Sequence, residues 1–310
     1  IADTLIVGRC LGASALAAVG SAYTLMTFLT SIIIGLCMGS GAVISIYYGK
    51  REMEKMKKSV FASFFFISFV TILLTVLVFA AIHPILHVLQ VPENIYGLMY
   101  EYVWVVFFGI VFVFFYNYFA FLLRALGNSM IPLCFLGVAA VLNIFLDILF
   151  VVNFHMGVGG AAFATVLSQA VSGVGIGIYT WVKEPELHPQ KGALFPDKKT
   201  VSEVVHNSVA ACVQQSVMNF GILMIQGLVN SFGTVVMAAF AAAVKIDSFA
   251  YMPAQEFGNA FSLFISQNYG AGAKVRVRDG MKKAAVVSMG FCSVISVGIF
   301  VLAPRLMGIF

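Results

Sequence analysis

The chain has 310 residues, of which 61% are hydrophobic and only 10% are charged, and its formal net charge is +5. Its mean hydropathy of +1.00 excludes an ordinary soluble domain and indicates an integral membrane protein. Uncharged runs such as 10–49, 59–92 and 148–182 are each long enough for one or two membrane-spanning helices, at about 20 residues per span.

Turn residues and charges divide the chain into nine predicted helical spans. The first, residues 1–10, is predicted to be a partial helix, because the chain opens inside an apolar segment and soon reaches a glycine-containing turn at 8–12. We therefore expect a sequence truncated at both ends. The other spans are predicted at 22–47, 59–82, 96–123, 130–152, 160–182, 207–230, 237–268 and 284–303.

Basic residues gather at every second connection between the predicted spans. The connections after the second, fourth, sixth and eighth spans, with their edges, hold 15 of the 18 Lys and Arg residues. Because Lys and Arg are enriched on the cytoplasmic side of membrane proteins, these connections are predicted to be cytoplasmic. They are the loops 49–58, 124–129, 184–206 and 270–283. This topology accounts for the positive charge, so no nucleic-acid partner is expected.

An internal repeat relates the two ends of the chain. A shift of 221 residues aligns identical residues in spans one to three with those in spans seven to nine, among them Gly12 with Gly233, Phe28 with Phe249 and Gly49 with Gly270. Six spans separate the copies, so both copies have the same orientation. The repeat predicts a first lobe at 1–183, a cytoplasmic connection at 184–206 and a partial second lobe at 207–310. Parallel repeats are typical of transporters, which bind substrate between the two halves.

One acid lies inside a predicted span. Asp147 interrupts the apolar segment 130–152, where an ionisable side chain is costly and is by default a functional candidate. Asn143 precedes it by four residues, so a helix places both on one face. The amide of Asn143 can therefore hydrogen-bond the carboxylate of Asp147 or help to coordinate a small cation. An alternative is that Asp147 is a cap or a neutralising group near the outer membrane surface.

Five short motifs occur in a characteristic order. They are Asp3-Thr4 with Val7-Gly8, Arg124-Ala-Leu-Gly127, Asn143 with Asp147, Gly160-Ala-Ala-Phe-Ala-Thr165, and Gln267-Asn268-Tyr-Gly270-Ala. Together they span the whole chain, which resembles the bacterial branch of the multidrug and toxic compound extrusion (MATE) family. The resemblance implies twelve helices in two six-helix lobes, alternating access, and export of organic cations or other amphiphiles driven by Na⁺ or H⁺. The second lobe would then be about half present.

The resemblance also implies an ion or proton site in the first lobe. The family positions correspond here to Asp3, Asn143, Asp147 and Thr165, and a Na⁺ ion at the first three is the only metal site expected. Three of these residues, Asp3, Asp147 and Thr165, lie within about five residues, or about 8 Å, of a predicted outer helix end, so they can share one pocket. The predicted seventh helix has Gln215 where another branch of the family has a glutamate, so a second-lobe ion site is not supported.

Three further polar residues are candidates for the substrate cavity. Glu256 follows Pro253 in the eighth predicted span, where a missing backbone donor breaks the helix and opens a carbonyl. Its expected partners are Lys245, Asp247 or Gln215, or a residue outside the chain. Asn117 in the fourth span and Gln215 in the seventh complete the set. The alternative is that these residues make only structural contacts between helices.

Two other functions compete with drug export. A flippase for lipid-linked precursors has a related architecture, but would line its cavity with several basic residues to hold phosphate. An integral membrane enzyme would carry clustered His or Asp motifs at a membrane face, and the sequence has none. We therefore predict an ion-coupled antiporter of the plasma (inner) membrane, not an enzyme. It is expected to be a monomer without cofactors, and its partners are the bilayer and small amphiphilic or cationic substrates.

Overall fold

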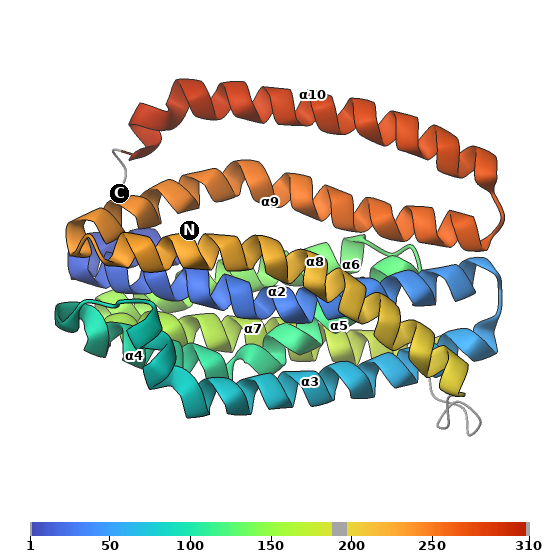
Figure 1. The fold of residues 1–310 in the computed structure, drawn as a ribbon, viewed down its shortest axis with the longest axis horizontal. Coiled ribbons are helices and arrows are strands. Elements are labelled where there is room, and N and C mark those ends of the chain that lie inside the picture. Colours follow the sequence, from blue (N-terminus) through green and yellow to red (C-terminus); the bar gives the residue numbers. More distant parts are fainter. Residues whose placement is uncertain (1, 188–196, 308–310) are drawn as a thin grey trace.

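The computed structural model describes residues 2–187 and 197–307, and nearly all of these residues are helical. The long helices lie side by side with roughly parallel axes (Figure 1). They are α1 (Ala2–Leu11), α2 (Ala13–Gly49), α3 (Met53–Val88), α4 (Glu93–Phe108), α5 (Ile110–Ala125), α6 (Met130–Asp147), α7 (Gly157–Lys183), α8 (Lys198–Asn230), α9 (Thr234–Gly270) and α10 (Lys274–Met307). A π-helical segment, η1 (Ile148–Asn153), follows α6, and a short 3₁₀ turn, η2 (Pro185–Leu187), follows α7. The predicted all-α membrane fold is confirmed.

Helix length and hydropathy fit a membrane-spanning bundle. Within the described ranges, six helices are long and apolar enough to cross a membrane, or up to eight if each of two bent pairs counts as one span. The predicted single span 96–123 is one of these pairs, because α4 and α5 meet at 47° around Gly109. The other pair lies within α9, which bends by 42° just before Pro253. Proline lacks the N–H that would bond the carbonyl four residues earlier, so the bend has a local cause.

Several helices are longer than predicted, and they replace parts of the predicted loops. α8 begins at Lys198, so the predicted loop 184–206 is helical over its last residues, while 188–196 lies outside the described residues. Asp197 caps this helix: its carboxylate accepts hydrogen bonds from the Thr200 hydroxyl at 2.8 Å and from the Thr200 backbone N–H at 3.2 Å. The same bonds lower the pKa of the Asp197 carboxyl below its ordinary value.

Two other basic segments that were predicted to be loops are also largely helical. α3 begins at Met53 and α10 at Lys274, so most of the predicted loops 49–58 and 270–283 form first helical turns. At the opposite end, α2 begins at residue 13 rather than 22, directly after a glycine cap. The basic segments do lie at one end of the bundle, but charged residues such as Lys and Glu are also good helix formers, so charge alone did not locate the helix ends.

The internal repeat is visible in the backbone. Gly12, which precedes α2, has φ 86° and ψ −178°, and Gly233, which precedes α9, has φ 90° and ψ 173°. The turns that end α2 and α9 have matching hydrogen bonds at the 221-residue offset: Arg51 N–H to Tyr48 O corresponds to Gly272 N–H to Tyr269 O, each at 3.0 Å. Both copies therefore have the same helix start and the same helix end.

α2 and α9 pack against each other through reciprocal contacts. A Cβ on Gly49 would collide with the carbonyl oxygen of Gln267, and a Cβ on Gly270 would collide with the carbonyl oxygen of Ile46. Gly270 is the repeat counterpart of Gly49, and Gln267 is the counterpart of Ile46, so each contact is the repeat counterpart of the other. Gly20 meets Ala241, its own counterpart, near the other end of the same helix pair. Reciprocal contacts between parallel helices indicate a two-fold axis along them, as expected for parallel repeats.

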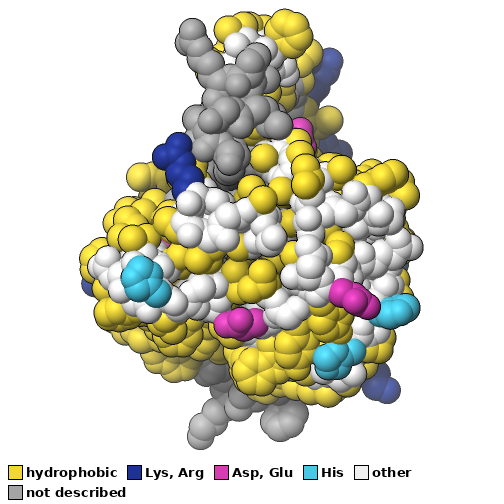
Figure 2. Space-filling view, turned by 90° about the vertical axis from the view of Figure 1, so that its left-hand side faces the viewer, with side chains coloured by type: hydrophobic (Ala, Val, Ile, Leu, Met, Phe, Trp, Pro, Cys, Tyr) yellow, Lys and Arg dark blue, Asp and Glu magenta, His cyan; other side chains and the backbone are white. Residues whose placement is uncertain are grey.

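The two ends of the bundle differ in charge. The basic end, which we define as the end with the α2–α3, α5–α6 and α9–α10 connections, carries the basic segments 50–58, 124 and 274–283. It lies on the right in Figure 1. Figure 2, which faces the opposite end, shows mostly apolar and uncharged surface with isolated acidic, histidine and basic side chains. The sides of the bundle expose large apolar residues such as Phe65, Phe69 and Ile178, as lipid contact requires.

Candidate functional site

Five elements meet around Asp147 in the half of the bundle away from the basic end. α1 packs against α6, η1 and α7, and α4 packs against α7. Asp147 is the last residue of α6 and is fully buried, while Asp3 lies in the first turn of α1. The π-helical segment begins at the next residue, Ile148, and such wide turns often occur at functional sites.

Hydrogen bonds involve three of the four predicted first-lobe residues, Asn143, Thr165 and Asp3. Asn143 Nδ2 lies 3.5 Å from Thr165 Oγ1, which joins α6 to α7. The Tyr102 hydroxyl donates to Asp3 Oδ2 at 3.3 Å and also interacts with Thr165. Asp3 and Asp147 are close enough to interact electrostatically. All four predicted positions are therefore gathered in one cluster, and Tyr102 is a fifth member that sequence reasoning missed.

Asp147 is the least compensated group of this cluster. Both of its carboxylate oxygens are buried, and neither has a hydrogen-bond partner among the described residues. The hydroxyl of Thr4, next to Asp3, is also buried without a partner there. A charged carboxylate in such surroundings is unfavourable unless a cation binds to it or a proton neutralises it. Carboxylate and hydroxyl oxygens are suitable ligands for a hard cation, whereas no group of three or more His, Cys, Asp or Glu side chains suits a transition metal in the described part of the chain.

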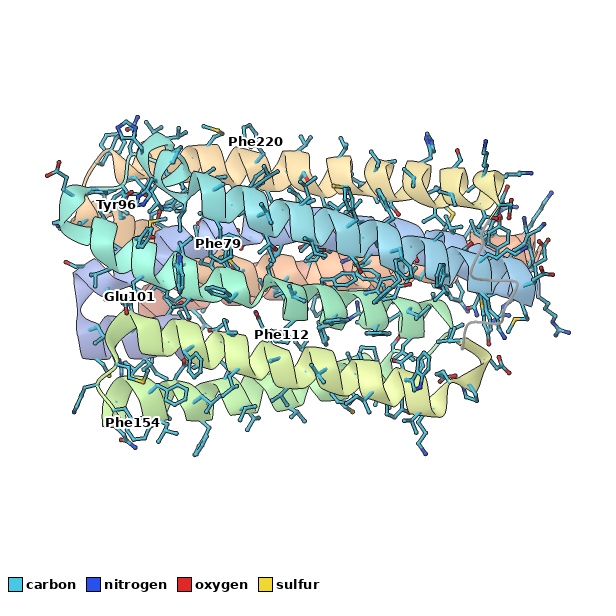
Figure 3. All side chains as sticks on the ribbon, turned by 90° about the horizontal axis from the view of Figure 1, so that it is seen from below. Phe79, Tyr96, Glu101, Phe112, Phe154 and Phe220 are labelled. Atoms are coloured by element: carbon cyan, nitrogen blue, oxygen red, sulfur yellow. The ribbon has the colours of Figure 1, made fainter. Side chains whose placement is uncertain are left out.

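Glu101, the neighbour of Tyr102, lies at the edge of this region. Its side chain is exposed, and a Cβ on Gly159 at the start of α7 would collide with it. Figure 3 places Glu101 toward the same end of the bundle as Tyr96, away from the basic end at which α3 begins. Glu101 is thus an acid at the end of the bundle rather than a member of the buried cluster.

The second-lobe candidates make different contacts from those expected. Glu256 Oε2 lies 3.4 Å from Arg124 Nη1, and Glu256 Oε1 accepts from Asn259 Nδ2 at 3.5 Å. Of the expected partners, Asp247 is exposed and shows no ion pair in the described part, and Gln215 bonds Gln255 instead; the side chain of Lys245 lies outside the described residues. Arg124 reaches Glu256 because α5 packs against α9, a contact between the two repeats that sequence separation conceals.

The two other cavity candidates lie on the helices that flank this ion pair. Gln215 is buried in α8, and its Oε1 accepts from Gln255 Nε2 on α9 at 3.2 Å. Asn117 is half-buried in α5 and donates to the Val113 carbonyl of its own helix at 2.8 Å. Asn117 precedes Arg124 by seven residues, so both lie on one face of α5. Polar groups of α5, α8 and α9 therefore occur along the contact between the two repeats.

α8 is held against α2 at both of its ends. Away from the basic end, Thr24 Oγ1 donates to Gln226 Oε1 at 3.0 Å. Near this pair, Asn230 Nδ2 donates to Ser21 Oγ at 3.1 Å, and all four side chains are buried. At the basic end, the Tyr47 hydroxyl donates to the Glu203 carboxylate. Because α2 also touches α9 near both ends, α2 is in contact with the second repeat at both ends of the bundle.

The profile of one protein family matches most of the chain. The family, MatE, aligns with residues 1–149 and 210–310. The chain belongs to the MatE family. The MATE resemblance of the motifs is thereby confirmed, and with it membership in a family of multidrug efflux transporters.

Curated relatives carry the same description. The chain is 32% identical over 275 residues to the probable multidrug resistance protein YpnP of Bacillus subtilis, and 26% identical over 319 residues to the probable multidrug resistance protein NorM of Thermotoga maritima. These alignments include 89% and 100% of the MATE chain and 61% and 67% of the two relatives. The chain thus spans roughly three fifths to two thirds of the relatives' length.

Solved MATE transporters have the same fold in two states. An inward-facing multidrug resistance MATE transporter matches 98% of this chain and 70% of its own, with a TM-score of 0.81 and 22% identity. An outward-facing structure matches 98% of this chain and 68% of its own, with a TM-score of 0.79 and 21% identity. At these identities the likeness establishes the fold alone. The nine predicted spans correspond in order to the helices of the structure. α1, α2 and α3 are one span each, α4 with α5 and α6 with η1 form one span each, and α7, α8, α9 and α10 are one span each.

Proposed function

We propose that this protein is an ion-coupled antiporter that exports amphiphilic or cationic compounds by alternating access, with Na⁺ or H⁺ neutralising Asp147. The observation that carries the proposal is the Asp147 carboxylate, which is buried without a hydrogen-bond donor among the described residues and beside a second acid, Asp3. A buried carboxylate is unfavourable in its charged form unless a bound cation, a proton or hydrogen-bond donors compensate it. A site that binds and releases a cation supplies the compensation that the surrounding residues lack.

Coupling would follow from competition for one acidic cluster. An incoming ion removes the negative charge that a cationic substrate requires, so the two ligands cannot both favour the same state. Asn143, Thr165 and Tyr102 would orient the ion or proton on the two acids. The experiment is a transport assay of the complete protein in liposomes, with Na⁺ and pH gradients imposed separately. Export of a cationic dye under at least one inward ion gradient is expected, and absence of transport under both would refute the proposal.

From the acidic cluster, where its cationic group would compete with the ion, the substrate would extend into the contact between the two lobes, 1–183 and 207–310. Glu256, Gln215 and Asn117 are our candidates for its polar contacts, because α5, α8 and α9 present them along the contact between repeats. A cationic substrate could replace Arg124 as the partner of Glu256, whose side chain is 56% exposed. The apolar and aromatic walls of a helical bundle suit amphiphiles of varied shape.

The basic end of the bundle would face the cytoplasm of a cell whose plasma membrane holds the protein. We expect cysteines introduced at Lys55, Lys199 and Arg278 to escape a membrane-impermeant maleimide applied to intact cells, in a cysteine-free background. All three positions are exposed, so only membrane sidedness would protect them. A cysteine at His155, exposed at the opposite end, is the matched control and should react. Labelling of any of the first three without permeabilisation would contradict this orientation.

A further inference from the structure

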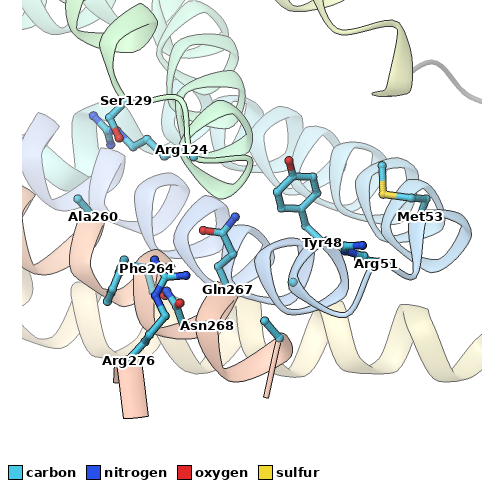
Figure 4. A pocket seen from close by; sticks show the side chains of 13 residues that line it. Tyr48, Arg51, Met53, Arg124, Ser129, Ala260, Phe264, Gln267, Asn268 and Arg276 are labelled. Carbon is cyan, nitrogen blue, oxygen red and sulfur yellow. The ribbon is translucent and has the colours of Figure 1, made fainter. Parts of the chain in front are cut away.

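A cavity of about 780 Å³ lies at the basic end, between the two repeats (Figure 4). The first repeat contributes the end of α2, the start of α3 and the α5–α6 turn. The second contributes the end of α9 and the start of α10. The lining residues are Tyr48, Gly49, Arg51, Met53, Arg124, Gly127, Ser129, Ala260, Phe264, Gln267, Asn268, Ala271 and Arg276.

The lining is cationic and rich in hydrogen-bond donors. It includes Arg51, Arg124 and Arg276 but no acidic residue. Arg124 is paired with Glu256, which lies outside the lining, whereas Arg51 and Arg276 form no ion pair with any residue that the structure describes. Tyr48, Ser129 and Gln267 add hydroxyl and amide groups, and Figure 4 shows these side chains among the arginines. Arginine presents a planar fork of N–H donors that matches the oxygens of a phosphate.

The backbone at Arg51 provides a second observation. Arg51 has φ 60°, in the left-handed region, and its counterpart in the second repeat is Gly272 with φ 70°. Glycine adopts this conformation readily, whereas a residue with a side chain is disfavoured there by steric contact of its Cβ with the backbone. The same turn therefore exists in both repeats, but only in the first does it hold a long cationic side chain against its conformational preference. Such strain is typical of functional positions.

We propose that this cavity binds a phosphate group, presented by an anionic phospholipid headgroup or by a soluble phosphate, and that Arg51 and Arg276 hold it from opposite repeats. Phe264 and Met53 provide apolar wall beside the arginines, as an amphiphilic ligand at a membrane surface requires. Because the ligand would contact both repeats at once, it would stabilise the state in which the basic ends of α2 and α9 touch. This site is separate from the acidic cluster around Asp147 and does not depend on the proposed transport cycle.

The test measures binding to the detergent-solubilised full-length protein by thermal unfolding. Wild type and Arg51→Gly/Arg276→Gln are titrated with short-chain phosphatidylglycerol, with phosphatidylcholine and with inorganic phosphate. Phosphatidylglycerol is expected to raise the unfolding midpoint of wild type, and the double variant should need about thirtyfold more lipid for the same rise, since each basic residue near a membrane surface contributes about 1 kcal/mol. Arg51→Gly installs the residue of the second repeat, so the variant should fold at least as well as wild type.

Arg278→Gln/Lys282→Gln is the matched control. It removes two exposed charges from α10, the helix that carries Arg276, and neither residue lines the cavity. If the control retains the wild-type lipid response while the cavity variant loses it, the site is supported. A response to phosphatidylglycerol alone identifies a lipid headgroup, and an equal response to inorganic phosphate identifies a soluble anion. Equal responses of wild type and of the cavity variant to every ligand would overturn the proposal.

Discussion

Asp147→Asn is expected to abolish ion-driven export while leaving the protein folded and inserted. The substitution is nearly isosteric, and it removes the charge of a fully buried side chain whose oxygens have no donor among the described residues. Without that charge neither Na⁺ nor H⁺ can be exchanged at this position. Transport in the presence of an ion gradient should therefore fall to the rate measured without a gradient. The loss is measured as the rate of dye export from liposomes under separate Na⁺ and pH gradients.

Asp247→Asn is the matched control for this prediction. It is also a carboxylate-to-amide change, but at an exposed residue of α9. It should transport at the wild-type rate, and the thermal midpoints of both variants should stay close to that of wild type. If Asp147→Asn pumped at the native rate under both gradients, the first-lobe mechanism would be wrong, and Glu256 would become the leading ion site.

Gly49→Val is expected to keep the basic end open. In the closed structure a Cβ at this position would collide with the Gln267 carbonyl oxygen, a backbone atom that cannot rotate away. Overpacking of this kind costs about 1–3 kcal/mol, and here it applies only to the state in which α2 and α9 touch. The equilibrium should therefore shift by roughly 5- to 150-fold toward the open state. Transport should fall in parallel, because alternating access requires this end to close.

The state of the basic end can be read out by cysteine reactivity. A cysteine in place of Gln267 should react faster with a water-soluble maleimide in the Gly49→Val background than in wild type. Gly137→Val is the matched control for adding the same residue to a helix, because Gly137 is exposed on α6 and a Cβ there would meet no atom within 4 Å. If Gly49→Val and Gly137→Val had equal reactivity and equal transport, the α2–α9 contact would not be a gate.

The fold was predictable from the sequence because its signals are strong and local. Long apolar runs determine membrane helices, and the 221-residue repeat pairs Gly12 with Gly233, whose backbone angles prove to match. Helix ends were less predictable. Charged residues at the membrane surface continue a helix as readily as they form a loop, which is why α8 begins at Lys198 and α10 at Lys274.

The candidate site was predictable only where a residue is costly in its sequence context. Asp147 is conspicuous in an apolar segment, and its helical spacing identified Asn143. Tyr102 was missed because a tyrosine in an aromatic-rich span has many ordinary explanations, and only the packing of α4 against α7 brings it to the acids. The Arg124–Glu256 ion pair was missed for the same reason, since it joins residues from different repeats.

Binding competition at Asp147 tests the central claim most directly. The affinity of the purified full-length protein for a fluorescent cationic substrate would be measured over a range of Na⁺ concentrations at fixed pH, and over a range of pH without Na⁺, for wild type and Asp147→Asn. We predict that at least one of the two ions weakens substrate binding to wild type, and that substrate binding to Asp147→Asn no longer depends on that ion. An ion dependence that is the same in both proteins would contradict competition at this acid.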